Sequence, residues 1–296
     1  KPFKKCCACG KQALTMCMGF GCNAAGVVGC RIIDSERERL LAVITNSLVP
    51  CNGRFPTLIS IITMFFIGTQ TKTLTSLTSA LFLTALILAG IGFTFLSTFI
   101  LSKTVLKGVP SSFTLELPPY RKPQIGKVIV RSVFDRTLFV LGRAAAVAAP
   151  AGIIIYLAAN ITVGDASILK ICSDFLDPFA RLMGLDGVIL IAFILGFPAN
   201  EIVIPIVIMA YTASGVLSDT GNLTAVKELF VSNGWNMTTA MCTMIFSLFH
   251  WPCSTTVLTI KKETQSIKWT VISVLLPTLL GILCCMLVAF VMKFVC

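Results

Sequence analysis

Residues 196–201 read Gly-Phe-Pro-Ala-Asn-Glu and interrupt a run, residues 187–218, that is otherwise free of charge. A helix needs about 20 mostly apolar residues to cross a hydrocarbon core of about 30 Å, so the run is long enough to span a bilayer. Pro198 breaks the helical hydrogen-bond ladder, and lipid cannot satisfy the backbone groups that the break frees. A broken helix at membrane depth therefore predicts a binding site.

The composition of the chain supports a membrane location for this break. Of 296 residues, 56% are hydrophobic and only 12% are charged, against about 25% charged in an average soluble domain. This excludes an ordinary soluble globule and predicts an all-α, polytopic membrane protein with about seven to eight hydrophobic segments. The net charge of +11 is typical of cytoplasmic loops in such a protein, so no nucleic-acid partner is expected.

The apolar runs fall into two kinds. Three are uninterrupted and predict ordinary membrane helices: residues 73–102, 144–164 and 269–292. Four are broken by glycine, proline or polar residues: residues 12–30, 40–70, 187–218 and 229–260. The four breaks form an internal duplication, because residues 19–23 (Gly-Phe-Gly-Cys-Asn) match residues 196–200, and Pro50-Cys51 matches Pro252-Cys253. Two repeat units with broken helices in corresponding places predict a transporter whose substrate site lies near the bilayer midplane.

Charge divides the chain and orients it. We expect residues 1–102 to form the first repeat with its following helix, residues 103–136 a basic cytoplasmic linker, and residues 137–296 a helix, the second repeat and the last helix. The aspartates between residues 165 and 186 favour the outer side. Residues 261–268 are basic, and basic segments are expected on the cytoplasmic side. If every broken segment crosses the membrane fully, however, these residues lie on the outer side. Either one broken segment is re-entrant or the charge rule fails here.

The breaks carry side chains suited to a metal ion. Cys22, Cys51 and Cys253 all lie at breaks, and thiolates are soft ligands that favour transition metals over alkaline-earth ions. Cysteines inside helices are more readily explained as packing residues. His250, the only histidine, adjoins the last break, but beside Trp251 it reads equally well as a packing residue.

Two further residue types complete the predicted transport path. Glu201 is a lone carboxylate in a run of 32 residues, and an unpaired carboxylate in lipid is costly enough to suggest a functional role. Asn23 and Asn200 occupy matching positions in the two repeats and are expected to support the path. The metal ligands predicted here are Cys22, Cys51, Cys253 and Glu201.

These motifs together resemble the membrane domain of the ferrous iron transport protein B family, FeoB. The resemblance rests on residues 19–23, 31–41, 50–56, 117–123, 196–201 and 252–264. One departure is Gly-Cys-Asn-Ala-Ala-Gly at residues 21–26, where the family has Gly-Cys-Asn-Val-Pro-Ala. The resemblance implies Fe(II) uptake across the bacterial plasma membrane, with Cys22, Cys51 and Cys253 as pore cysteines and Glu201 as an acidic residue of the second Gate segment.

The resemblance also implies partners. The family's amino-terminal GTPase domain, which would use GTP and Mg²⁺ to gate or power transport, is not in this sequence, so we expect the chain to be part of a longer polypeptide. Small Feo accessory proteins and a homo-oligomer are further expected partners. The chain itself is expected to be a transporter domain rather than an enzyme, since it has no phosphate-binding loop or hydrolase motif.

Two other classes of function stay open at this point. The Gate segments are shared with nucleoside carriers, so a transporter of nucleosides or other organic solutes is one alternative. Such a site needs hydrogen-bond formers and an aromatic stacking face, and only one of the three tryptophans, Trp251, lies near a break. The other alternative is a redox-sensing membrane protein whose cysteines form disulfides.

Overall fold

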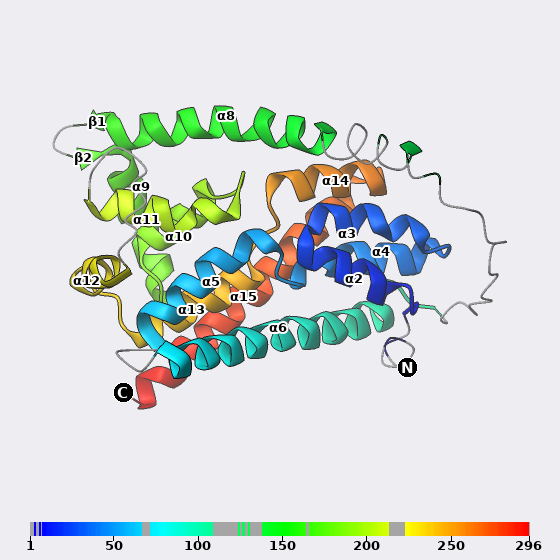
Figure 1. Ribbon diagram of the computed structural model, residues 1–296, viewed down its shortest axis with the longest axis horizontal. Coiled ribbons are helices and arrows are strands. Elements are labelled where there is room, and N and C mark those ends of the chain that lie inside the picture. Colours follow the sequence, from blue (N-terminus) through cyan, green and yellow to red (C-terminus); the bar gives the residue numbers. More distant parts are fainter. Residues whose placement is uncertain are drawn as a thin grey trace.

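The computed structural model describes residues 8–66, 72–108, 138–163, 166–212 and 223–295, with a few isolated residues elsewhere. The described chain is almost entirely helical, which confirms the all-α prediction (Figure 1). Its two short strands, β1 (Thr162–Val163) and β2 (Ala166–Ser167), pair as an antiparallel hairpin. The predicted basic linker, residues 103–136 with the motif at 117–123, lies for the most part outside the described residues.

Two long helices have the length and composition of membrane spans. They are α6 (Lys72–Lys103) and α15 (Ile267–Val295). The helices α9 (Ile168–Leu182) and α10 (Gly187–Leu195) pass the same test only as a pair, and they meet at a bend of 108°. The third predicted ordinary helix is α8 (Phe139–Asn160), whose described apolar part is shorter than a span. By length alone the described residues therefore give two spans, or three with the bent pair, and the predicted seven to eight segments are not confirmed.

The first repeat begins with a helical hairpin. Helix α2 (Gln12–Gly21) and helix α3 (Asn23–Gly29) are joined by the single extended residue Cys22. Gly29 at the end of α3 lies against Met18 of α2, so the two helices run in opposite directions. A short 3₁₀ helix, η1 (Cys30–Ile32), follows. Lys11 and Asp34, just outside the hairpin's two ends, form an ion pair of 2.6 Å that lowers the pKa of the Asp34 carboxyl.

The rest of the first repeat runs away from the open end of this hairpin. It consists of α4 (Glu36–Thr45), η2 (Asn46–Leu48), η3 (Asn52–Arg54), α5 (Phe55–Ile61) and the π-helical turn η4 (Ile62–Phe66). Near its start, Arg37 donates a hydrogen bond of 3.0 Å to the carbonyl of Leu106, just beyond α6. At its far end, Phe65 stacks on Trp235 with ring centroids 5.7 Å apart.

The second repeat has the same plan. Helix α10, the turn η6 (Asn200–Ile202) and helix α11 (Val203–Thr212) form a hairpin, because the hydroxyl of Tyr211 at the end of α11 donates to Asp186, which caps the start of α10. After α12 (Leu223–Ser232), α13 (Met237–Phe249) and α14 (Ser254–Thr264) are separated by the last predicted break. Helix α12 thus lies between the second hairpin and α13.

The two repeats are inverted relative to each other. The first hairpin opens at the end of the molecule where α6 finishes, since Gln12 donates to Thr98 of α6 at 3.3 Å. The second hairpin opens at the end where α15 finishes, because Asp186 and Lys293 line one cavity there. We call these ends the Lys103 end and the Lys293 end. In Figure 1 the two hairpins accordingly lie on opposite sides of the molecule.

This inversion determines at which end of the molecule residues 261–268 lie. Helix α13 starts at the Lys293 end, where Asn236 lines the cavity with Lys293. Helix α14 finishes at the Lys103 end, where Arg31 forms a two-pronged ion pair with Glu263 at 2.6 and 2.7 Å. Because the second hairpin turns back on itself, residues 261–268 lie at the same end of the molecule as Lys103.

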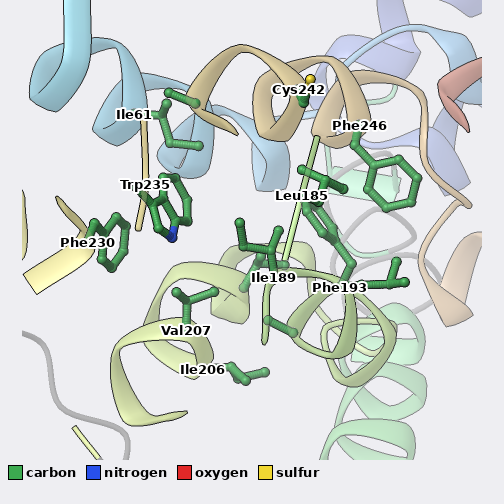
Figure 2. Packing of buried hydrophobic residues seen from close by; sticks show 14 of the residues in the cluster. Ile61, Leu185, Ile189, Phe193, Ile206, Val207, Phe230, Trp235, Cys242 and Phe246 are labelled. Atoms are coloured by element: carbon green, nitrogen blue, oxygen red, sulfur yellow. The ribbon is translucent and has the colours of Figure 1, made fainter. Parts of the chain in front are cut away.

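The main apolar core lies between the second hairpin and its neighbours. Figure 2 shows side chains from α5, α10, α11 and α13 gathered in this cluster. Phe193 of α10 and Phe246 of α13 meet edge to face with centroids 4.9 Å apart. The core thus fixes the tip of the second hairpin against the last break, which positions the site described below.

Gly187, at the start of α10, packs so closely against α9 that adding one methyl group there is expected to destabilise the fold. A Cβ atom on Gly187 would lie 2.0 Å from the carbonyl oxygen of Ser173 in α9, which is backbone and cannot swing aside. We expect Gly187→Ala to destabilise the folded protein by about 3 kcal/mol, the upper end of ordinary overpacking. Thermal unfolding in detergent measures this. Gly92→Ala in α6 is the control, because no atom lies within 4 Å of its Cβ position, and equal stability of both variants would contradict the prediction.

Candidate functional site

The first break places a cysteine at the tip of the first hairpin. Cys22 is extended (φ −154°, ψ 122°) between two helices, and its side chain is exposed. Its amide donates to Met18 at 3.1 Å and its carbonyl accepts from Gly26 at 3.0 Å, so the break leaves its own backbone satisfied. The thiol is therefore presented at the tip without a cost in backbone hydrogen bonds.

Asn23 ties this tip to the second break. It is 3% exposed, and its carbonyl accepts a hydrogen bond of 2.9 Å from the Asn46 amide. With its own amide nitrogen turned toward the neighbouring carbonyls, Asn23 donates to Gly19 at 3.1 Å and to Val49 at 3.3 Å. Val49 directly precedes Pro50-Cys51. The predicted supporting residue Asn23 therefore joins the first break to the second.

The second break is organised by a buried arginine. Arg54 is fully buried, and one nitrogen, Nη1, donates to the carbonyls of Ser47 at 3.0 Å and Leu248 at 2.7 Å. The other, Nη2, donates to the carbonyls of His250 at 3.0 Å and Trp251 at 3.4 Å. One side chain from the first repeat thus satisfies the backbone at the broken end of α13 in the second repeat. Free carbonyls at a helix end need such partners when water is absent.

Two of the predicted thiols lie near this arginine. Cys51 is 8% exposed and Cys253 is half-buried, and both thiols lie close enough to Arg54 to interact with it electrostatically. The Cys253 sulfur is also 3.2 Å from the hydroxyl oxygen of Thr256. The second and last breaks thus bring two of the four predicted ligands within electrostatic reach of one buried cation.

The third break approaches the same place from the second hairpin. Asn200 is 6% exposed, and its Oδ1 lies 3.3 Å from Nε2 of His250. The carbonyl of Phe197, at the tip, accepts a hydrogen bond of 2.9 Å from the amide of Ser254. Glu201 is exposed, and its carboxylate lies beside Gly53 in the second break. A Cβ atom added to Gly53 would be 3.3 Å from this carboxylate.

Three of the four breaks therefore converge on Arg54. The structure brings Cys51, Cys253, Glu201 and Asn200 to this junction, and places Cys22 at the exposed tip of the other hairpin. Among the described residues, no three His, Cys, Asp or Glu side chains lie together as a ready-made metal site. The predicted ligand set Cys22, Cys51, Cys253 and Glu201 thus stays a prediction.

The sequence reasoning missed Arg54. It is the only charged residue between positions 40 and 70, so the argument that singled out Glu201 applies equally to it. His250 was noted but was given no role, because the sequence alone does not show what its ring nitrogens face.

Comparison with known families assigns the chain. Residues 83–136 match the family model described as the C terminus of ferrous iron transport protein B, and residues 140–267 match the Gate model, described as nucleoside recognition. The first of these models is specific to FeoB. The chain resembles FeoB. The FeoB resemblance drawn from the sequence motifs is thereby confirmed.

Curated FeoB relatives extend the match beyond these two regions. The chain is 28% identical over 279 residues to "Fe(2+) transporter FeoB" of Staphylococcus aureus strain MSSA476, covering 90% of the chain and 39% of that protein. The chain is also 25% identical to the FeoB protein of Leptospira interrogans, over 88% of the chain and 40% of that protein. It is 26% identical to the FeoB protein of Methanocaldococcus jannaschii, over 90% of the chain and 39% of that protein. The chain thus spans about two fifths of the length of these relatives. No solved structure matches it significantly.

Proposed function

We propose that this chain forms the membrane path through which Fe(II) passes, at the junction where three broken helices meet around Arg54. The convergence of Cys51 and Cys253 on one buried cation carries this proposal. The names of the FeoB relatives, which are Fe(2+) transporters, support Fe(II) as the transported ion.

Charge at the junction suits a divalent cation. With the ion bound, thiolates at Cys51 and Cys253 and the exposed carboxylate of Glu201 would carry three negative charges, and the buried Arg54 with one Fe(II) ion would carry three positive charges. Buried charges are tolerated when they are compensated in this way. Hydrogen bonds to four carbonyls hold the guanidinium of Arg54 in place at the junction.

The inverted hairpins give this path two entrances. Each hairpin opens at a different end of the molecule, and its tip reaches inward toward the junction. Inverted repeats around a central site are the architecture of many alternating-access transporters. Two re-entrant hairpins with crossings by α4–α5, α6, α8, α13–α14 and α15 would supply the seven hydrophobic segments predicted from the sequence.

The setting of the chain follows from the same proposal. It would be a multi-pass protein of the bacterial plasma membrane, with its Lys103 end in the cytoplasm. A GTPase domain that binds GTP and Mg²⁺ would act on that basic end, and Feo accessory proteins and further copies of the chain would be its partners.

Uptake into proteoliposomes tests the proposal. The full-length protein is reconstituted under reducing, anaerobic conditions, and accumulation of Fe(II), Zn(II) and a labelled nucleoside is measured with and without GTP. We expect Fe(II) to accumulate above the level in protein-free vesicles and GTP to increase its rate. Accumulation of the nucleoside alone would instead support the organic-solute alternative.

A further inference from the structure

The only histidine of the chain occupies a central place in the junction. His250 follows the last residue of α13 and is 1% exposed. Its ring packs against Phe193 of the second hairpin, with centroids 5.0 Å apart, and against Trp251, with centroids 5.9 Å apart. A ring held in this way presents its two nitrogens in fixed directions.

The contacts of one nitrogen determine the tautomer. Nδ1 lies 2.9 Å from the carbonyl oxygen of Ser247 and 3.1 Å from that of Phe246. Both partners are acceptors, so Nδ1 carries the proton and donates it. In the neutral imidazole, Nε2 then has no proton and presents a lone pair. Metal-binding histidines are typically oriented by such a hydrogen bond from the other ring nitrogen to a backbone carbonyl.

The lone pair of Nε2 faces another acceptor. Oδ1 of Asn200, at the tip of the second hairpin, lies 3.3 Å away and is also buried. Bonds of about 2.1 Å from one metal ion, set at about a right angle, hold a nitrogen and an oxygen donor about 3.0 Å apart. The observed separation is therefore close to that of two neighbouring ligands on a single ion.

We propose that Nε2 of His250 and Oδ1 of Asn200 form a binding subsite for the transported Fe(II) ion. The subsite rests on the proposed function and adds to it a nitrogen and an oxygen ligand, which are harder than thiolate. Borderline ions such as Fe(II) accept imidazole and oxygen ligands readily, whereas thiolates alone favour softer ions. A mixed set of this kind lets Fe(II) bind and also leave.

Two substitutions of His250 separate ligation from packing. His250→Asn keeps a side-chain N–H near Nδ1 for the Ser247 carbonyl but has no atom at Nε2. His250→Gln extends to the Nε2 position, where its carbonyl oxygen is a weaker ligand. In proteoliposomes of the full-length protein, we expect His250→Asn to raise the half-saturating Fe(II) concentration for uptake at least about tenfold. His250→Gln should restore part of the loss.

Two further variants complete the experiment. Asn200→Ala removes the facing oxygen from a different helix and should also raise the half-saturating Fe(II) concentration. Phe249→Leu is the control, because this side chain packs on Phe93 of α6, away from the subsite, and should leave the concentration unchanged.

The outcomes distinguish the subsite from the proposed function. If the wild-type protein takes up no Fe(II), the proposed function itself fails, and the subsite fails with it. If the wild type transports Fe(II) and His250→Asn has an unchanged half-saturating concentration, the subsite alone is overturned. Should His250→Asn fail to fold, an unchanged concentration in Asn200→Ala overturns the subsite equally.

Discussion

Replacing Arg54 with methionine is expected to cost about 3–5 kcal/mol of stability and to lower the thermal unfolding midpoint by about 10 °C or more. The substitution keeps an unbranched apolar side chain but removes the guanidinium and its hydrogen bonds to Ser47, Leu248, His250 and Trp251. Each buried carbonyl left without a donor adds a desolvation penalty. Because Arg54 connects the two repeats, the loss falls on their junction rather than on one helix. Unfolding of the purified protein in detergent measures the effect.

Arg54→Lys provides an informative intermediate. An ammonium group keeps the charge but lacks the planar fork that reaches carbonyls on two sides. We expect its stability to lie between that of the wild type and that of Arg54→Met. Arg181→Met is the control, because Arg181 is an exposed residue of α9 that pairs with Asp177, and exposed ion pairs contribute little. Equal midpoints for Arg54→Met and Arg181→Met would refute the role assigned to Arg54.

Cys51→Ser and Cys253→Ser are each expected to reduce Fe(II) uptake by more than about tenfold while leaving the protein folded. Serine has nearly the size of cysteine, but its hydroxyl stays protonated and is a poor ligand for a transition metal. Uptake into proteoliposomes, normalised to folded protein, measures the loss. Cys22→Ser should also reduce uptake if the exposed thiol at the first hairpin tip lies on the path.

Cys172→Ser is the matched control for these variants. Cys172 is an exposed cysteine of α9 and lies at none of the four breaks. Uptake should be unchanged by this substitution. The thiol assignment fails if Cys51→Ser and Cys253→Ser transport Fe(II) as well as Cys172→Ser does.

The helix breaks were predictable because proline and glycine act locally. Each predicted break appears as an interruption between helices, at Cys22, at residues 49–54, at residues 196–202 and at residues 250–253. The direction of the repeats was not predictable in the same way. Sequence order is identical in both halves, and only contacts such as Tyr211 to Asp186 show that a broken segment turns back instead of crossing.

The composition of the junction depended on contacts between distant residues. Arg54 donates a hydrogen bond to the carbonyl of His250, which lies 196 positions later in the sequence. A lone charge in an apolar run identifies Arg54 as unusual. It does not show which groups Arg54 binds. Likewise, the role of His250 depends on which of its nitrogens faces Asn200, and this follows from the packing of three helices and not from any motif.

The most direct test of the account is the absorption spectrum of the full-length protein loaded anaerobically with Co(II) in place of Fe(II). Thiolate ligands give Co(II) an intense sulfur-to-metal charge-transfer band in the near ultraviolet. We expect this band in the wild type and its loss in the double variant carrying Cys51→Ser and Cys253→Ser. A bound Co(II) ion without the band, or a band that is unchanged in the double variant, would contradict it.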